Sequence, residues 1–351
     1  MDKEWSDKFR KMQTAIGKKN SFKDGVGFLL ELRSDVFGQI ASIVNTFPDE
    51  AFGEMPFPGA DGYHSKTLAY SMWHIFRIED ITANTLIAGK EQILFRDGWR
   101  GKTKSPIVTT GNELKGEEIA RFSEALDVKA LFDYCKAVME ETNGMLEGLA
   151  YEDLKRRFTP EDRERVVESG SVSSDEAAFW LIDYWCGKDV LGLIRMPFSR
   201  HWIMHVEAMR RIKNRLVKTA RKGVDPVAYC GLSCDHCFLG EWCGSCRTRY
   251  NTCSYATMFP DRVCPNAACC RERGYDGCWE CGELATCEKG FYAGGNDTNA
   301  VRAMAFFIGK HGKKELRRVL DNLHERYDFK KIQEILGSDT EEGLRILEEA
   351  R

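Results

Sequence analysis

Apolar positions recur with helical spacing over most of the first part of the chain. The pattern predicts long helices at residues 22–46, about 65–87, about 128–149 and about 198–219. Cys135 lies on the apolar stripe of the third, so we interpret it as a small buried hydrophobe and not as a nucleophile. Four long amphipathic helices with one elongated connection predict a mainly α fold that begins with an antiparallel four-helix bundle.

The connections are marked by residues that interrupt helices. The Pro/Gly-rich stretch FPDEAFGEMPFPGADGY cannot continue the first long helix, and residues 95–116 look irregular, with a short helix after them. Ser173 and Glu176 have the spacing of a capping box, which predicts a helix that opens there and breaks near Gly187.

The end of the chain is again helical, in short segments. KGVDPVAY, with Gly223 and Pro226, marks a domain boundary. We therefore predict a bundle over 1–222, a cysteine-rich metal-binding module over 223–297 and a helical tail packed on that module over 298–351. The tail should contain helices around 298–310, 312–326, 328–336 and 339–350.

The overall composition is ordinary, with 43% hydrophobic and 30% charged residues and a net charge of −3. Such a balance argues against a general nucleic-acid binder. We interpret the basic segment RRIKNRLVKTARK (210–222) as a solvated helix end. The first residues contain no apolar run and no stretch is long enough to span a membrane, so we expect a cytoplasmic protein.

Cysteine is the exception, because 12 of the 14 cysteines lie between Cys230 and Cys287. In a reducing compartment such density indicates metal ligation before disulfides. The C-x2-C pairs are typical of zinc sites, although spacing does not say which cysteines share an ion. The predicted ligands are Cys230, Cys234, Cys237, Cys243, Cys246, Cys278, Cys281 and Cys287. The roles of the others stay open: Cys253, Cys264, Cys269 and Cys270.

An iron–sulfur cluster is the alternative for this region. CGLSCDHC (230–237) has the C-x3-C-x2-C spacing of radical-SAM enzymes, but only 114 residues follow it, without the strands of an α/β barrel. Another kind of cluster remains a minor alternative to zinc. The segment 230–287 has a net charge of −2, which favours a protein partner or a structural role over nucleic acid.

Three histidines form the second candidate site. In RHWIMH (200–205), His201 and His205 lie four residues apart on one helix face, beside the core. His74 lies near the middle of the apolar face of the second helix and can meet them across a bundle. If that helix included His64, ten residues of rise would displace His64 by roughly 15 Å. A shared metal and ordinary buried histidines with partners are both compatible with this spacing.

TLAYSMWHIFRIED (67–80), followed far downstream by RHWIMH, resembles the DinB-like (YfiT-related) metal-binding four-helix-bundle superfamily, over roughly residues 22–216. The resemblance implies that His74, His201 and His205 bind a divalent cation such as zinc or nickel. Three histidines leave positions open, as in catalytic zinc sites, where a bound water or thiol is easily deprotonated. Known activities in the superfamily include transfer reactions with small thiols such as mycothiol or bacillithiol and a thiol-dependent isomerisation, and many members have no assigned reaction, so the resemblance implies a site more firmly than a substrate.

Charged residues follow His74 on the same helix. We expect Arg77, Glu79 and Asp80 to be solvated charges of the helix face, with a role beside the metal or toward an acidic substrate as the alternative. Downstream, YCGLSCDHCF…CGSC…CWEC…C with KGFYAGG resembles a cysteine-rich family of the DUF3795 type, over about 225–320. That resemblance implies zinc and no reaction.

Two function classes follow. We favour a metal-dependent, transferase-like enzyme that acts on a small thiol or a thiol-linked substrate at the three-histidine site. The alternative is a non-catalytic metal or redox sensor whose cysteine module contacts a protein partner. A homodimer is one arrangement that the sequence allows.

Overall fold

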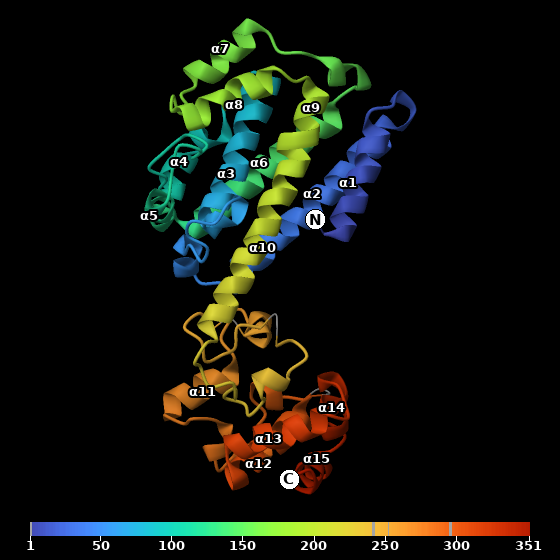
Figure 1. Cartoon of the computed structure of the whole chain (residues 1–351), viewed down its shortest axis with the longest axis vertical. Helices are drawn as coiled ribbons and strands as arrows, with labels where there is room; N and C mark the ends of the chain where they lie inside the picture. The colour runs from blue at the N-terminus through green and yellow to red at the C-terminus, as the bar shows by residue number, and fades with distance from the viewer. Residues whose placement is uncertain (1, 241–242, 252, 295–296) are drawn as a thin grey trace. The chain divides into compact units, whose positions relative to one another are not determined.

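The computed structural model describes residues 2–240, 243–251, 253–294 and 297–351. The chain is mainly helical, at 68% helix, and the described residues contain no strand, which confirms the predicted α class. It divides into two compact units, Met1–Arg215 and Leu216–Arg351 (Figure 1). None of the described helices has the length and apolar character needed to cross a bilayer.

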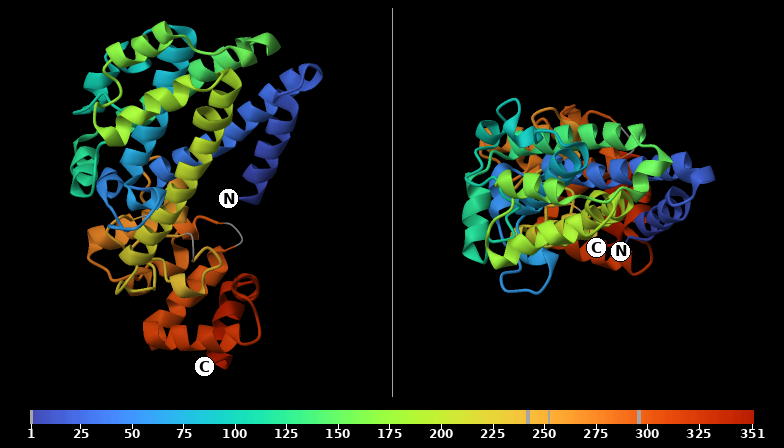
Figure 2. Two further views of the ribbon diagram at one scale, coloured as in Figure 1. Left: turned by 45° about the horizontal axis from the view of Figure 1, so that its top comes forward. Right: turned by 90° about the horizontal axis from the view of Figure 1, so that it is seen from above.

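The first unit is built from long helices joined by shorter ones. Its long helices are α1 (Lys3–Ile16), α2 (Phe22–Thr46), α3 (Leu68–Asp80), α6 (Val128–Gly148) and α10 (His201–Ala220). Its shorter helices are α4 (Trp99–Thr103), α5 (Glu117–Ala125), α7 (Pro160–Glu168), α8 (Glu176–Cys186) and α9 (Val190–Arg195). Helices α1 and α2 lie side by side in both views of Figure 2, and α6 packs against α2 and α3.

Both histidine-bearing helices adjoin π-helical turns. Helix α3 continues as a π-helix over Ile81–Ala88 and ends at Gly89, which has a φ of +63°. Residues Met196–Arg200 form another π-helical turn, directly before α10. A π-helical turn widens a helix locally, and such turns are common next to functional sites.

Helix α3 is the buried centre of the first unit. Every residue from Leu68 to Asp80 is buried, because α5, α6 and the turn before α10 all pack against this helix. The prediction that Arg77, Glu79 and Asp80 are solvated was therefore wrong, since all three side chains are fully buried.

The helix predicted at Glu176 exists and is followed by Gly187 as its C-cap, but the predicted N-cap residue, Ser173, was wrong. The side chain of Asp175 accepts a hydrogen bond from the backbone N–H of Ala177, which makes Asp175 the cap. Ser173, two residues before this cap, instead accepts a bond from the backbone N–H of Asp175. Aspartate caps as well as serine does, and here it lies next to the first helical residue.

The second unit contains the cysteine-rich segment and a group of short helices. These are α11 (Pro265–Arg273), α12 (Thr298–His311), α13 (Lys313–His324), α14 (Phe329–Leu336) and α15 (Thr340–Glu349). Helix α12 packs against α13, α14 and α15, and the four form one compact group in Figure 2. The other face of α12 contributes Val301 and Ala305 to a second apolar cluster, which contains the buried cysteines.

Candidate metal centre

The structure brings the three predicted histidines together. One ring nitrogen each of His74, His201 and His205 lies within 4.8 Å of the others, and all three side chains are buried. The Nε2 atoms of His74 and His201 are 3.3 Å apart. Two ligands at 2.0–2.1 Å from a tetrahedral zinc ion would be about 3.3–3.4 Å apart, so this pair has the spacing that an ion requires.

A hydrogen bond on the far side of the His74 ring determines which of its two nitrogens can bind a metal. The Nδ1 atom of His74 lies 2.9 Å from the backbone oxygen of Thr110, which can only accept, so Nδ1 carries the proton. The lone pair is then on Nε2, which faces the other two histidines. Metal-binding histidines are commonly oriented by such a bond to a carbonyl.

His74 is one of four residues of α3 whose side chains bond to the loop Val108–Gly111. The four consecutive carbonyls of the loop accept hydrogen bonds, in order, from Arg77 at 2.7 Å, Trp73 at 2.9 Å, His74 at 2.9 Å and Tyr70 at 3.0 Å. The loop therefore runs antiparallel to α3 and is held at each residue. We call these contacts the carbonyl ladder. It determines where the His74 ring lies along and around the helix.

Helix α10, which carries the other two histidines, is tied to α3 through Trp202, the residue after His201. Trp202 donates its Nε1–H to Glu79 at 2.7 Å, and Glu79 forms a two-point ion pair with Arg33 of α2 at 2.6 and 3.0 Å. The Arg33 guanidinium also lies 4.3 Å from the centre of the Trp202 ring. These contacts join α2, α3 and α10, one residue from His201 and five residues from His74.

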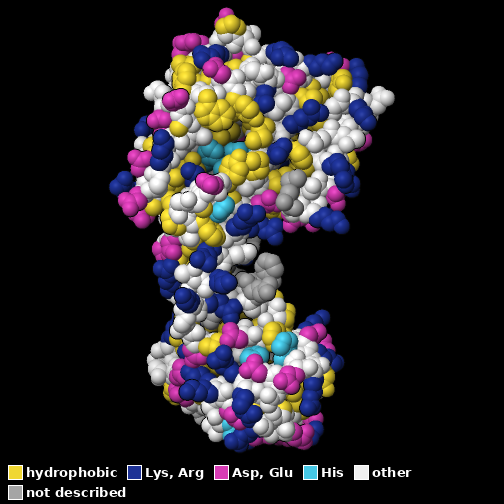
Figure 3. Space-filling model, viewed as in Figure 1, with side chains coloured by type: hydrophobic (Ala, Val, Ile, Leu, Met, Phe, Trp, Pro, Cys, Tyr) yellow, Lys and Arg dark blue, Asp and Glu magenta, His cyan; other side chains and the backbone are white. Residues whose placement is uncertain are grey.

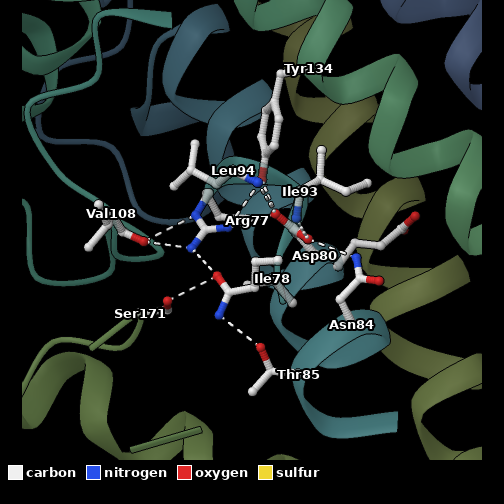
Figure 4. A network of polar contacts seen from close by, with 12 residues as sticks. Arg77, Ile78, Asp80, Asn84, Thr85, Ile93, Leu94, Val108, Tyr134 and Ser171 are labelled. Atoms are coloured by element: carbon white, nitrogen blue, oxygen red, sulfur yellow. Dashed lines mark hydrogen bonds and ion pairs between the residues drawn. The ribbon is translucent and has the colours of Figure 1, made fainter. Parts of the chain in front are cut away.

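A second buried network, the α3 network, surrounds Arg77 and Asp80 (Figure 4). Arg77 donates to Asp80 at 3.0 Å and to the hydroxyl of Tyr134 at 3.1 Å, and that hydroxyl donates to Asp80 at 2.8 Å. Asp80 also accepts the backbone N–H groups of Ile93 and Leu94. Neither charge is left uncompensated, which is the condition for burying both.

Burial keeps the three imidazoles neutral. It lowers the pKa of His74 to about 4, against the opposing effect of the Thr110 carbonyl. The pKa values of His201 and His205 are also well below the usual value. Burial is the main cause, and the neighbouring histidines add a smaller effect in the same direction. A neutral ring is the form that binds a metal.

Several ring nitrogens have no partner in the protein. His205 makes no hydrogen bond with either nitrogen, and His201 makes none with Nδ1. An unsatisfied buried polar atom costs about 1–3 kcal/mol. A cation bound between the rings would relieve this cost for the nitrogens that face it, so the residues present fit a divalent ion.

The segment before α3 lies against the histidine cluster. Tyr63 contacts the ring of His205 edge to face at 4.5 Å, and the Lys66 ammonium lies 5.1 Å from the centre of the Tyr70 ring, which stacks on His74. His64 is outside α3, so the argument from helical rise does not apply to it, and it packs against Phe57 instead. Figure 3 shows histidine side chains among apolar side chains on the visible face of this unit.

The predicted cysteine ligands do not converge in the same way. All described cysteines are free thiols, and among the described parts of the chain only the histidine group brings three ligand atoms within 4.8 Å. Close sulfur contacts occur instead between Cys243 and Cys253 and between Cys270 and Cys278. Cys253 and Cys270, whose roles the spacing left open, are thus in direct contact with predicted ligands.

Sequence reasoning missed the groups that orient the histidines. Arg33 and Trp202 lie on apolar helical stripes, and only an arginine on such a stripe could have been noticed as unusual. Thr110 acts through its backbone, which leaves no signal in the sequence. Comparison of the chain with models of protein families, and with curated proteins, finds no match.

Proposed function

We propose that the first unit is a metal-dependent enzyme of the DinB-like type, in which α2, α3, α6 and α10 correspond to the four-helix bundle. In this proposal His74, His201 and His205 hold a zinc, nickel or similar ion. The observation that carries it is the convergence of three buried, neutral imidazoles, two of which have ring nitrogens without any partner in the protein.

The ligand number supports catalysis more than a closed structural site. Among the residues that the structure describes, no cysteine or carboxylate joins the three histidines. Three protein ligands are typical of catalytic zinc, whereas structural zinc has four. Such an ion supplies Lewis acidity and lowers the pKa of a group that binds at the open position.

The surroundings of the cluster support a small anionic substrate. Lys66 is half-buried, burial lowers its pKa, and it forms no ion pair with any described residue. The ring of Tyr70 contacts both the Lys66 ammonium and the His74 ring. Lys66 can therefore bind a carboxylate of the substrate while the thiol of the same molecule lies at the metal centre. A small carboxylate-bearing thiol is the substrate class that we propose for a transfer reaction.

Elemental analysis of the anaerobically purified protein tests the site. The double variant His201→Ala, His205→Ala should lose one metal equivalent relative to the wild type. His64→Ala is the matched control, because this histidine is nearby in sequence but outside the group, and it should lose none. Equal metal content in wild type and double variant would refute the site.

Cobalt substitution tests the substrate class. Addition of a small thiol to the cobalt-loaded protein should produce a sulfur-to-cobalt charge-transfer band, and the double variant should show no such change. Because cobalt bound to cysteines absorbs in both proteins, the relevant quantity is the difference on adding thiol. Lys66→Met should weaken the binding of a carboxylate-bearing thiol more than the binding of an uncharged thiol of similar size.

The second candidate function is a metal or redox sensor. It is favoured by the cysteine contacts of the second unit, because neighbouring thiols can respond to metals and oxidants. A sensor predicts that metal loading or oxidation changes binding to a protein partner, with no turnover of thiol. The enzyme predicts turnover that disappears in the double histidine variant.

A further inference from the structure

The cysteine-rich segment encloses two separate cavities. The first, of about 60 Å³, is lined by seven cysteines: Cys230, Cys234, Cys237, Cys243, Cys246, Cys253 and Cys264. The second, of about 30 Å³, is lined by five: Cys269, Cys270, Cys278, Cys281 and Cys287. Every cysteine between Cys230 and Cys287 lines one of the two, and none lines both. Each volume is sufficient for an ion.

The first cavity contains a thiol pair with a specific hydrogen-bond environment. The Cys243 and Cys253 side chains are hydrogen-bonded to each other, and Cys243 Sγ also accepts the backbone N–H of Ser254 at 3.3 Å. Hydrogen bonds of this kind stabilise the thiolate, which is the form that binds metal.

The second cavity has a comparable pair and more donors. Cys270 Sγ and Cys278 Sγ are 3.6 Å apart. Tetrahedral zinc–sulfur bonds of about 2.3 Å place two sulfurs about 3.8 Å apart, whereas a disulfide needs about 2.05 Å. Donors point at three sulfurs: Asn266 at Cys278 (3.8 Å), Arg273 at Cys281 (3.6 Å) and Lys289 at Cys269 (3.7 Å).

The loops that carry the cysteines are held by side chains of other segments. Arg271 donates to the carbonyl of Cys246 at 2.8 Å, Arg302 donates to that of Cys287 at 2.8 Å, and the Tyr292 hydroxyl donates to that of Cys230. The segment has only short helices of its own, so these bonds determine the positions of the thiols. Ligands held in this way need little reorganisation to bind.

We propose that the second unit holds two independent thiolate zinc sites, one in each cavity, in which Cys253 completes the first and Cys270 the second. The proposal deepens the zinc assignment that spacing suggested and adds two ligands to it, because neither Cys253 nor Cys270 belongs to a C-x2-C pair. Separate cavities favour two ions over one shared cluster. One close sulfur pair already exists in each cavity, and binding of an ion would draw further cysteines of the same cavity toward that pair.

Metal analysis of single variants in the full chain tests this. Cys253→Ser and Cys270→Ser should each lose one zinc equivalent, and the double variant should lose two. Cys186→Ser, a half-buried cysteine outside the segment, is the matched control and should lose none. The double histidine variant is measured in parallel and gives the amount of metal bound by the cysteines alone. The count of cysteine-bound zinc then does not depend on whether the bundle holds a metal. Loss of all cysteine-bound metal in either single variant would overturn the separation into two sites.

Alkylation of thiols covers the case in which a variant binds less metal because it is misfolded. In Cys253→Ser, the remaining cysteines of the first cavity should become reactive while those of the second stay protected, and Cys270→Ser should show the reverse. Uniform reactivity in both variants, or unchanged protection, contradicts the proposal. Visible absorbance with iron and sulfide in the purified protein would overturn the zinc assignment.

Discussion

The buried ion pair between Arg33 and Glu79 gives the sharpest test of how the metal centre is held. In Glu79→Gln the side chain keeps its shape but loses its charge, so the Arg33 guanidinium remains buried without a counter-ion. The amide must also place an NH2 group where the carboxylate accepted from Arg33 or Trp202. Removal of one partner of a buried pair costs about 3–5 kcal/mol.

The control for this variant is the same substitution at the surface. Glu141 pairs with Arg96 at 2.6 Å, the same distance as the shorter Arg33–Glu79 contact, but both side chains are 33% exposed. Solvent screens such a pair, so Glu141→Gln should cost at most about 1 kcal/mol. The two variants differ in burial and not in chemistry.

Urea unfolding followed by tryptophan fluorescence measures the effect, since most tryptophans lie in the first unit. A loss of 3–5 kcal/mol should lower the urea midpoint of this unit by about 1–2 M. Because Trp202 follows His201, Glu79→Gln should also weaken metal binding by about 10- to 100-fold, as loss of an orienting partner does. If Glu79→Gln costs no more than Glu141→Gln, or if metal affinity is unchanged, then the pair does not position the site.

Three further predictions concern other parts of the structure. In the metal-free protein the pKa of His74 is lower in the folded than in the unfolded chain, so the unfolded chain binds more protons between these two values. Stability should therefore fall as the pH drops from about 6.5 to about 4. A urea midpoint that stays constant over this range would contradict the prediction. Tyr134→Phe removes the hydroxyl of the α3 network and should lower the free energy of unfolding, measured in urea, by about 1–2 kcal/mol, with metal content unchanged. Loss of metal in this variant would show that the network also positions the histidines. Gly290→Ala places a Cβ 2.2 Å from Asn266 Oδ1 and should lower the melting temperature of the second unit more than Gly274→Ala, which has similar φ but open space; equal effects would exclude the contact as the cause.

Local periodicity predicted the helices well. The bounds expected for the first long helix, 22–46, are those of α2, and the C-terminal helices were placed within a few residues. These elements follow from the spacing of apolar residues, which is a local property. Periodicity did not show that α3 is buried on all sides, because its three charged residues look like a polar face. Their compensation depends on partners distant in sequence, such as Arg33, which is 46 residues from Glu79.

The candidate sites differ in the same way. The three histidines were identifiable because each lies on an apolar helical stripe, and helical geometry brings such stripes together. The cysteines lie mostly in loops and short turns, where spacing predicts only the neighbours within one turn. The contact between Cys243 and Cys253 joins a C-x2-C cysteine to one ten residues later, and that between Cys270 and Cys278 joins α11 to the following turn. Loop geometry of this kind is not encoded in any periodic pattern.

The position of the charges on α3 has a consequence for the precision of the metal centre. An apolar helix in an apolar core is held by contacts that change little when the helix rotates or slides slightly. The carbonyl ladder and the Arg33–Glu79 pair are directional, and each is broken by a displacement of about 1 Å. A three-ligand site requires its nitrogens to be placed within about 0.5 Å. Buried polar groups add little net stability, so we infer that those on α3 serve mainly to fix the histidines from two sides of the helix.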